Sequence, residues 1–130
     1  PKEAAASKEA PTTPFAAAPI VASADDMVRF WHGLLRGRLL KPETVRGQFQ
    51  HLYPMFDQGT FYGRGVMLYD VGDPKTGRFT WLGHSGGSPG IKAVVAYAVE
   101  TGAYVAVALN SDGSAEATAN LLLKALLSPR

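Results

Sequence analysis

The sequence predicts an α+β fold, in which an antiparallel β-sheet has helices packed on its face. Apolar residues recur at helical spacing between residues 27 and 35, and again after Ser114. Between these regions lie short apolar segments separated by turn sequences such as GDPKTG and ETG. Short turns join antiparallel neighbours, and the sheet is the only large surface on which a long apolar final helix can bury a face.

Two helices are predicted in the first half, after a Pro/Ala-rich linker or mobile segment at residues 1–19. Ser23 is placed to accept hydrogen bonds from first-turn amides in a capping box with Asp26. One apolar helix face follows at Met27, Phe30, Trp31, Leu34 and Leu35. Gly37 ends this helix, and Pro42 opens a shorter one that runs through about Phe49.

Four strands are predicted after a loop-like stretch at residues 51–59. Phe61–Val71 and Arg78–Gly83 form a hairpin around the turn at 72–77, and Ala93–Val99 pairs with Ala103–Leu109. After a turn at 110–113, Ser114 caps a final helix. The residues expected on one face of this helix are Ala115, Ala119, Leu122 and Leu126.

Composition limits the function classes. The 130 residues are 46% hydrophobic and 18% charged, which is typical of one soluble globular domain, and no apolar run approaches the roughly 20 residues of a membrane span. A net charge of +2 without a nucleic-acid motif argues against a nucleic-acid partner. The chain has no cysteine, and neither His32 nor His51 has metal-ligand spacing, so we expect no metal or other cofactor.

The segment Gly83-His84-Ser85-Gly86-Gly87 matches G-x-S-x-G, the nucleophile elbow of α/β-hydrolases. An elbow needs a helix directly after the serine, but here a Ser88-Pro89-Gly90 turn leads into another strand. The elbow enzymes also place their histidine after the serine, and no histidine follows Ser85. We therefore do not expect Ser85 to be a nucleophile.

Three separated segments carry a family resemblance: SADDMVRFWHGLLRGRLL, then YGRGVMLYD, then GHSGGSPGIKAVVAYAVETGAYVAVALNSD, followed by a helix. Residues 20–130 resemble the C-terminal part of the serine β-lactamase and penicillin-binding-protein-like hydrolases. This superfamily includes class C β-lactamases, D-aminopeptidases, DD-carboxypeptidases and esterases. The resemblance implies a β-lactamase-like (DD-peptidase-like) fold and acyl-enzyme hydrolysis of an ester, amide or β-lactam, in a periplasmic or secreted location.

In this resemblance, His84-Ser85-Gly86 looks like the family's His-x-Gly or Lys-Thr-Gly triplet on the strand beside the cleft. It implies a catalytic role for His84 and an oxyanion-hole donor in the Gly87 backbone N–H. Ser85 and Gly86 would bind substrate, the first by its hydroxyl and the second by letting substrate approach the backbone. Lys75-Thr76-Gly77 spells the alternative triplet, but turn chemistry after Pro74 explains it.

The other two family motifs are missing. No serine is followed by Lys at +3, and no tyrosine is followed by Asn at +2. Because Pro1 is not an initiating Met, we expect a processed or cut start, and a longer hydrolase whose N-terminal part supplies Ser-x-x-Lys and Tyr-x-Asn. The segment alone is then inactive, with a small molecule or peptide as substrate. The alternative is a non-catalytic module that uses the same groove to bind a peptide or partner.

Overall fold

A computed structural model describes residues 20–56, 59–72 and 77–126. The predicted linker at 1–19 lies outside these residues. The predicted α+β class is confirmed: six antiparallel strands lie in the order in which they occur in the chain, with three helices around them. The helices are α1 (Ala24–Leu35), α2 (Pro42–Gln48) and α3 (Ala115–Ala125), and the strands are β1 (Tyr53–Pro54), β2 (Thr60–Tyr62), β3 (Met67–Asp70), β4 (Thr80–Ser88), β5 (Ile91–Ala98) and β6 (Ala103–Leu109).

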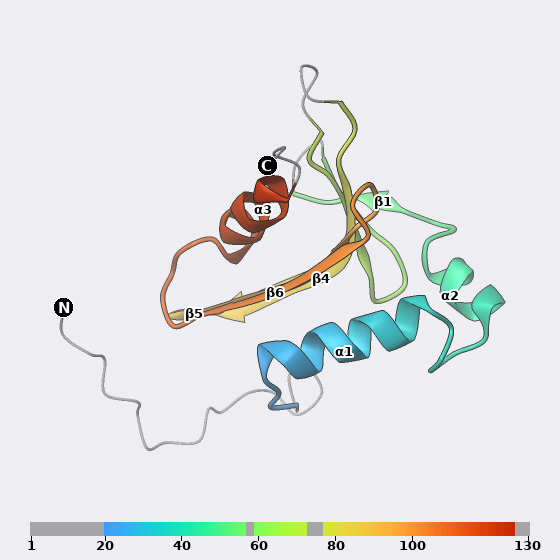
Figure 1. Cartoon of the computed structure of the whole chain (residues 1–130), viewed down its shortest axis with the longest axis horizontal. Coiled ribbons are helices and arrows are strands. Elements are labelled where there is room, and N and C mark those ends of the chain that lie inside the picture. Colours follow the sequence, from blue (N-terminus) through green and yellow to red (C-terminus); the bar gives the residue numbers. More distant parts are fainter. Residues whose placement is uncertain (1–19, 57–58, 73–76, 127–130) are drawn as a thin grey trace.

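The helices cover opposite faces of the sheet, with α3 on one side and α1 on the other (Figure 1). The larger core lies under α3 and is centred on Trp81, Met67 and Leu123. The smaller core lies under α1, where Trp31 and Leu34 pack on Val95. Helices can pack on both faces because neighbouring residues of β5 point to opposite sides, Val94 and Ala96 into the core under α3 and Val95 into the core under α1.

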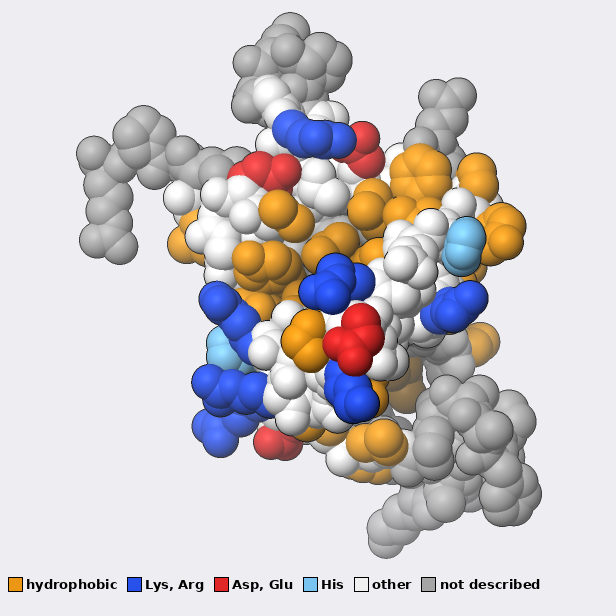
Figure 2. All heavy atoms as spheres, turned by 90° about the vertical axis from the view of Figure 1, so that its right-hand side faces the viewer, with side chains coloured by type: hydrophobic (Ala, Val, Ile, Leu, Met, Phe, Trp, Pro, Cys, Tyr) orange, Lys and Arg blue, Asp and Glu red, His pale blue; other side chains and the backbone are white. Residues whose placement is uncertain are grey.

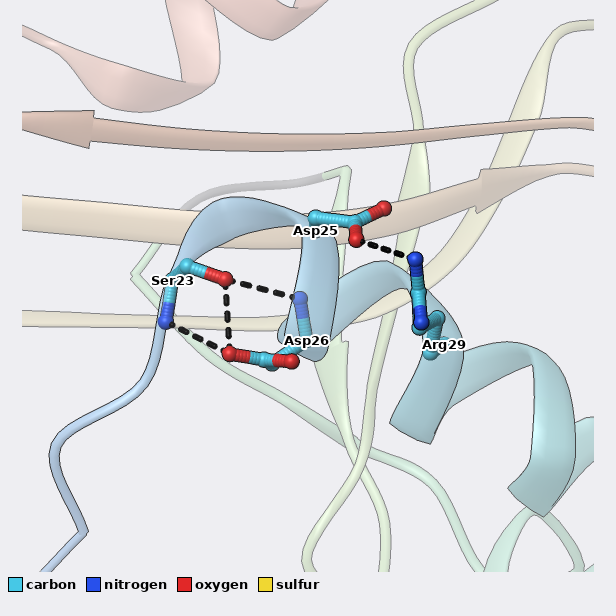
Figure 3. Close-up of polar contacts among 4 residues, drawn as sticks. All are labelled: Ser23, Asp25, Asp26 and Arg29. Atoms are coloured by element: carbon cyan, nitrogen blue, oxygen red, sulfur yellow. Dashed lines mark hydrogen bonds and ion pairs between the residues drawn. The ribbon is translucent and has the colours of Figure 1, made fainter.

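The first helix begins at the predicted capping box (Figure 3). Asp26 N–H donates to Ser23 Oγ over 3.1 Å, and Ser23 N–H donates to Asp26 Oδ2 over 3.2 Å. The hydrogen bond from the Ser23 hydroxyl lowers the pKa of Asp26. Of the predicted apolar face, Trp31 and Leu34 are buried, whereas Phe30 is 51% exposed. The Trp31 indole N–H donates to the Leu82 carbonyl over 2.8 Å and so fastens α1 to β4.

The prediction of one strand over Phe61–Val71 was wrong, because the chain turns back between β2 and β3. Gly65 has a φ of 72°, and Gly63 N–H donates to the Val66 carbonyl over 2.8 Å. A Cβ at Gly63 would lie 2.2 Å from the Gln48 carbonyl oxygen, so the bend also requires a glycine there. Gly63-Arg64-Gly65 is thus a hairpin turn and not strand interior.

The stretch predicted as loop at 51–59 contains β1, a two-residue exposed strand that pairs with β2. Two exposed residues carry no alternation that would signal a strand. The strand predicted over Arg78–Gly83 continues to Ser88, through the whole glycine-rich motif. Ala103–Leu109 was predicted with the bounds that the structure has.

The predicted face of α3 was partly wrong. Ala115 and Ala119 are buried as expected, but the third buried residue is Leu123. Leu122 is 51% exposed and Leu126 63% exposed. Leucines occupy positions 121–123, so spacing alone does not single out the inward one.

Hydrophobic side chains are also open to solvent over the face seen in Figure 2, with Lys and Arg among them. None of the helices in the described ranges is long and apolar enough to cross a membrane.

Candidate active-site edge

The motif lies on a part of β4 that has an open edge. On one side, β4 pairs with β5 along its whole length, from Trp81 opposite Ala98 to Ser88 opposite Ile91. On the other side, the pairing with β3 stops at Gly83, which lies opposite Met67, the first residue of β3. Within the described part of the chain, no strand pairs with the second edge of residues 84–88. Unpaired backbone groups are therefore available here to an extended ligand.

The register shows which backbone groups face this edge. The Val99 N–H donates to the Thr80 carbonyl over 3.0 Å, so the backbone of Thr80 points toward β5. Bonding direction alternates along an antiparallel pair, and the β4–β5 register runs without a bulge. The backbone N–H groups of Ser85 and Gly87 are therefore directed away from β5, to the open edge.

His84 is held by a tyrosine from β2. Its Nε2 lies 3.1 Å from the Tyr62 hydroxyl, and the two rings meet edge to face with their centroids 5.5 Å apart. Both side chains are half-buried. The contact fixes the imidazole beside the open edge, where it can exchange a proton with a bound group or donate a hydrogen bond.

Ser85 is held by a second tyrosine, from β3. The Tyr69 hydroxyl donates to Ser85 Oγ over 2.9 Å and lies 3.0 Å from Met67 Sδ. Burial raises the pKa of Tyr69 to about 12, so the phenol remains a protonated donor at neutral pH. Ser85 Oγ accepts from Tyr69, and its own hydrogen has only a long contact of 3.9 Å to Met67 Sδ, so it can turn to a bound acceptor.

The structure gives Ser85 no elbow geometry. It is an interior residue of β4, and the next element is β5, not a helix. Among the described residues, no histidine hydrogen-bonds to Ser85 Oγ, since the neighbouring imidazole of His84 contacts Tyr62. A nucleophilic serine needs a base within hydrogen-bond reach. The hydroxyl beside Ser85 Oγ belongs to Tyr69, whose pKa is raised to about 12, so at neutral pH it is a donor and not a base.

The last two glycines of the motif, Gly86 and Gly87, differ in their surroundings. A Cβ at Gly87 would lie 2.4 Å from the Ile91 carbonyl oxygen, so the sheet itself requires glycine there. A Cβ at Gly86 would meet no heavy atom within 4 Å, and its φ is not positive. Nothing in the described chain explains a glycine at position 86, whereas close approach of a ligand to the backbone would.

Two adjoining cavities lie beside the motif. One, of about 230 Å³, is lined by His84, Ser85, Gly86, Tyr62 and Lys92, among others. The other, of about 340 Å³, lies between α3 and the sheet. Phe56, Met67, Ser85 and Glu116 line both, so the two cavities meet at the Ser85 side chain.

A carboxylate ties the motif's turn to the start of α3. Asp112, predicted only as a turn former, accepts from Gly90 N–H over 2.8 Å. Its Oδ1 also lies 3.8 Å from Lys92 Nζ, which donates to the Ser88 carbonyl over 3.1 Å. These contacts hold the β4–β5 turn against the segment that leads into α3.

The remaining sequence candidates lie elsewhere. Lys75 and Thr76 are outside the described residues. His32 packs edge to face on Tyr104 with centroids 5.3 Å apart, and His51 is exposed. No group of three or more metal-ligating side chains occurs in the described ranges. Tyr62, Tyr69 and Glu116 were not predicted as site residues, because only the strand pairing and α3 bring them to the motif.

Comparisons with known proteins identify the fold. A family model described as Beta-lactamase matches residues 1–128. The D-amino acid amidase from Ochrobactrum anthropi SV3, solved with D-phenylalanine, has a TM-score of 0.65 and 25% identity, over 80% of this chain and 36% of the amidase. A penicillin binding protein from Bacillus halodurans has a TM-score of 0.64 and 21% identity, over 80% of this chain and 30% of that protein, which shows a shared fold. No curated protein sequence matches.

The expected resemblance is thus confirmed, and the chain corresponds to about a third of each of these two solved proteins. The residues that the family model matches, 1–128, are nearly all of the 130 in the sequence. The chain belongs to the beta-lactamase family.

Proposed function

We propose that this chain is the cleft-bordering, C-terminal part of a serine hydrolase that acts through an acyl-enzyme on an ester, amide or β-lactam. In this proposal, residues 20–130 belong to the catalytic domain of that hydrolase. The partner is the N-terminal part of the same hydrolase, which supplies the nucleophilic Ser-x-x-Lys and the Tyr-x-Asn motif. The ligand is a small molecule or a peptide, and no cofactor takes part.

The observation that carries this proposal is the open edge of β4 at residues 84–88, with the Gly87 N–H directed outward. An acyl-enzyme mechanism needs a donor aimed at the oxygen that gains charge in the tetrahedral intermediate. Gly87 is one such donor in the proposal. The second donor is the backbone N–H of the nucleophilic serine in the partner.

The side chains of the motif take separate roles. His84 orients a substrate carboxylate or assists proton transfer, and Tyr62 keeps its ring in place over 3.1 Å. Ser85 donates its hydroxyl hydrogen to the substrate while it accepts from Tyr69. Gly86 leaves room for the substrate against the strand, since a Cβ there would meet nothing of the chain itself.

The first experiment is intact-mass spectrometry before and after treatment with a fluorophosphonate probe, with the purified chain alone and with a preparation that holds the N-terminal part. The chain alone gains no adduct, because it has no Ser-x-x-Lys. In the combined preparation the adduct lies on the other polypeptide. An adduct on Ser85 would overturn the proposal, and Ser85→Ala serves as the control that locates it.

A second candidate function is supported by the same edge. An unpaired strand edge binds an extended peptide by strand addition, with no chemistry required. A non-catalytic module would bind such a peptide at residues 84–88 with equal affinity whether or not the nucleophile is present. Fluorescence anisotropy with a labelled extended peptide, alongside the fluorophosphonate assay, separates the two: peptide binding with no adduct on any polypeptide favours the module.

A further inference from the structure

The cavity of about 340 Å³ between α3 and the sheet differs in its lining residues from the adjoining cavity of about 230 Å³. Its floor is the α3-facing side of β3 and β4, with Met67, Val71 and Trp81, and α3 contributes Ala117. A binding pocket of this kind is typically apolar with a few polar groups, at volumes from about 300 Å³ upward. The volume and the lining both fit a site for a small organic group.

The charges at the two cavities differ. Lys92 and His84 line the smaller cavity only. Among the residues that line the larger cavity, Glu116 alone is charged, and none is basic. A carboxylate or phosphate placed there would lie near a like charge with no cation to offset it. The larger cavity therefore favours an uncharged group.

Phe56 stands at the mouth of both cavities in an unusual conformation. Its φ is 65°, the one positive value among the described residues that are not glycine. A bulky residue in this region costs on the order of 1–3 kcal/mol and occurs mainly where a site requires it. The ring is also 85% exposed, although it lines both cavities. An aromatic ring held against its preference at an apolar opening is suited to packing on a ligand.

We propose that the larger cavity binds an uncharged apolar side chain of a ligand, an aryl or branched alkyl group, with Phe56 packing on it at the mouth. The site is continuous with the motif, because the two cavities share Met67 and Ser85. In the substrate this group is the apolar part of the acyl moiety, an assignment that rests on the proposed function. Binding of the group itself does not require the nucleophile.

The chain carries its own reporters for this site. Of its two tryptophans, Trp81 lines the cavity, whereas Trp31 lies in the core under α1 and is bonded to Leu82. With 5-fluorotryptophan incorporated, ¹⁹F NMR gives one signal for each. Benzamide is the neutral probe, and benzoate has the same ring with a charge. We expect benzamide to shift the Trp81 signal saturably and to leave the Trp31 signal unchanged. Benzoate should shift neither signal.

Two variants test the walls, each with a matched control. Phe56→Ala lowers benzamide affinity about tenfold through the lost ring contact, whereas Phe30→Ala, which removes a ring that is 51% exposed on α1, does not. Ala117→Met fills the cavity from the exposed side of α3 and abolishes the shift. Ala125→Met makes the same change further along α3, outside the cavity, and leaves the shift intact.

Three results would overturn the proposal: a Trp81 signal that does not move, an equal response to benzoate, or unchanged binding in both cavity variants. A fourth result that would overturn the proposal can come from adding the N-terminal part of the hydrolase. If that polypeptide shifts Trp81 and prevents benzamide from binding, the cavity is a packing surface between the two parts. Fluorophosphonate labelling is measured separately. If benzamide binds but the labelling result contradicts the proposed function, the pocket proposal still holds. If the labelling result supports the proposed function but benzamide does not bind, only the pocket proposal is overturned.

Discussion

The two halves of β4 have the same strand geometry and different surroundings. Residues 80–83 pair with β3 on one edge and β5 on the other, and Trp81 among them is buried in the larger core. Residues 84–88 pair with β5 alone, and the last three are exposed. The first half is fixed by packing, whereas the second half is held only from one side and by two tyrosine hydroxyls.

This difference indicates which half of β4 contributes to the free energy of unfolding and which half is available to a ligand. Changes in the paired half must be absorbed by the sheet or the core, so they lower the free energy of unfolding. Changes in the open half meet few atoms of the chain, so they affect what binds there. Matched substitutions in the two halves of β4 test this difference.

The largest expected effect comes from a pair of glycines. A Cβ at Gly83 would lie 2.2 Å from the Val95 carbonyl oxygen, a backbone atom that cannot move without disturbing β5. Gly83→Ala should therefore lower the free energy of unfolding by about 3 kcal/mol. Gly86→Ala meets nothing and should leave it within about 1 kcal/mol, on the stabilising side. Urea denaturation of both variants measures the difference, and equal losses would contradict the division of the strand.

The next effect concerns the hydrogen bond that fastens α1 to the paired half. Trp31 and Trp81 are 4% and 1% exposed, but only Trp31 has a partner for its indole N–H, and the Trp81 Nε1 has none among the described residues. Trp31→Phe and Trp81→Phe lose similar volume. Trp31→Phe should cost about 1 kcal/mol more, because it alone breaks a hydrogen bond. Urea denaturation of both would refute this if the losses were reversed.

Tyr69 links the two halves, and its contribution depends on pH. Tyr69→Phe removes the donor to Ser85 Oγ and should cost about 1 kcal/mol at neutral pH. The pKa of Tyr69 is raised from 10.0 to about 12, so the unfolded chain loses this proton before the folded one does. The associated stability is fully present below pH 10 and is lost between pH 10 and 12.

Urea denaturation at a series of alkaline pH values tests this dependence. The decline above pH 10 should be shallower in Tyr69→Phe than in the unchanged chain. Tyr53→Phe is the matched control, since that ring is 70% exposed and, among the described residues, its hydroxyl has no hydrogen bond to Ser85, Tyr69 or Met67. An identical alkaline decline in all three proteins would contradict the buried, protonated donor.

Much of the fold could be predicted because local chemistry decides it. The capping box at Ser23 and the uncharged run Ala103–Leu109 are visible in the sequence and lie where they were expected. The split between β2 and β3 could not be predicted, since it depends on the approach of the Gln48 carbonyl to Gly63. The inward face of α3 was ambiguous, because three consecutive leucines offer three faces.

The candidate site divides in the same way. Residues 84–87 were identified from their resemblance to a family motif, and the structure adds the open edge on which they lie. Tyr62 and Tyr69 stand 22 and 16 residues from their partners and are brought to them by pairing through β3. No linear spacing predicts such contacts, since hairpin register is set by the turn between the strands.

The smallest expected effect on stability belongs to the open half itself. Tyr62→Phe keeps the ring that packs on His84 and removes only the hydroxyl 3.1 Å from Nε2. Because both side chains are half-buried, solvent can replace the lost partner, and the cost should stay below about 1 kcal/mol. The change should instead appear at the imidazole, as a shifted ¹⁵N resonance of His84 Nε2 with the His51 resonances unmoved. An unchanged Nε2 resonance would mean that Tyr62 does not hold His84, and that the open half has one tyrosine contact instead of two.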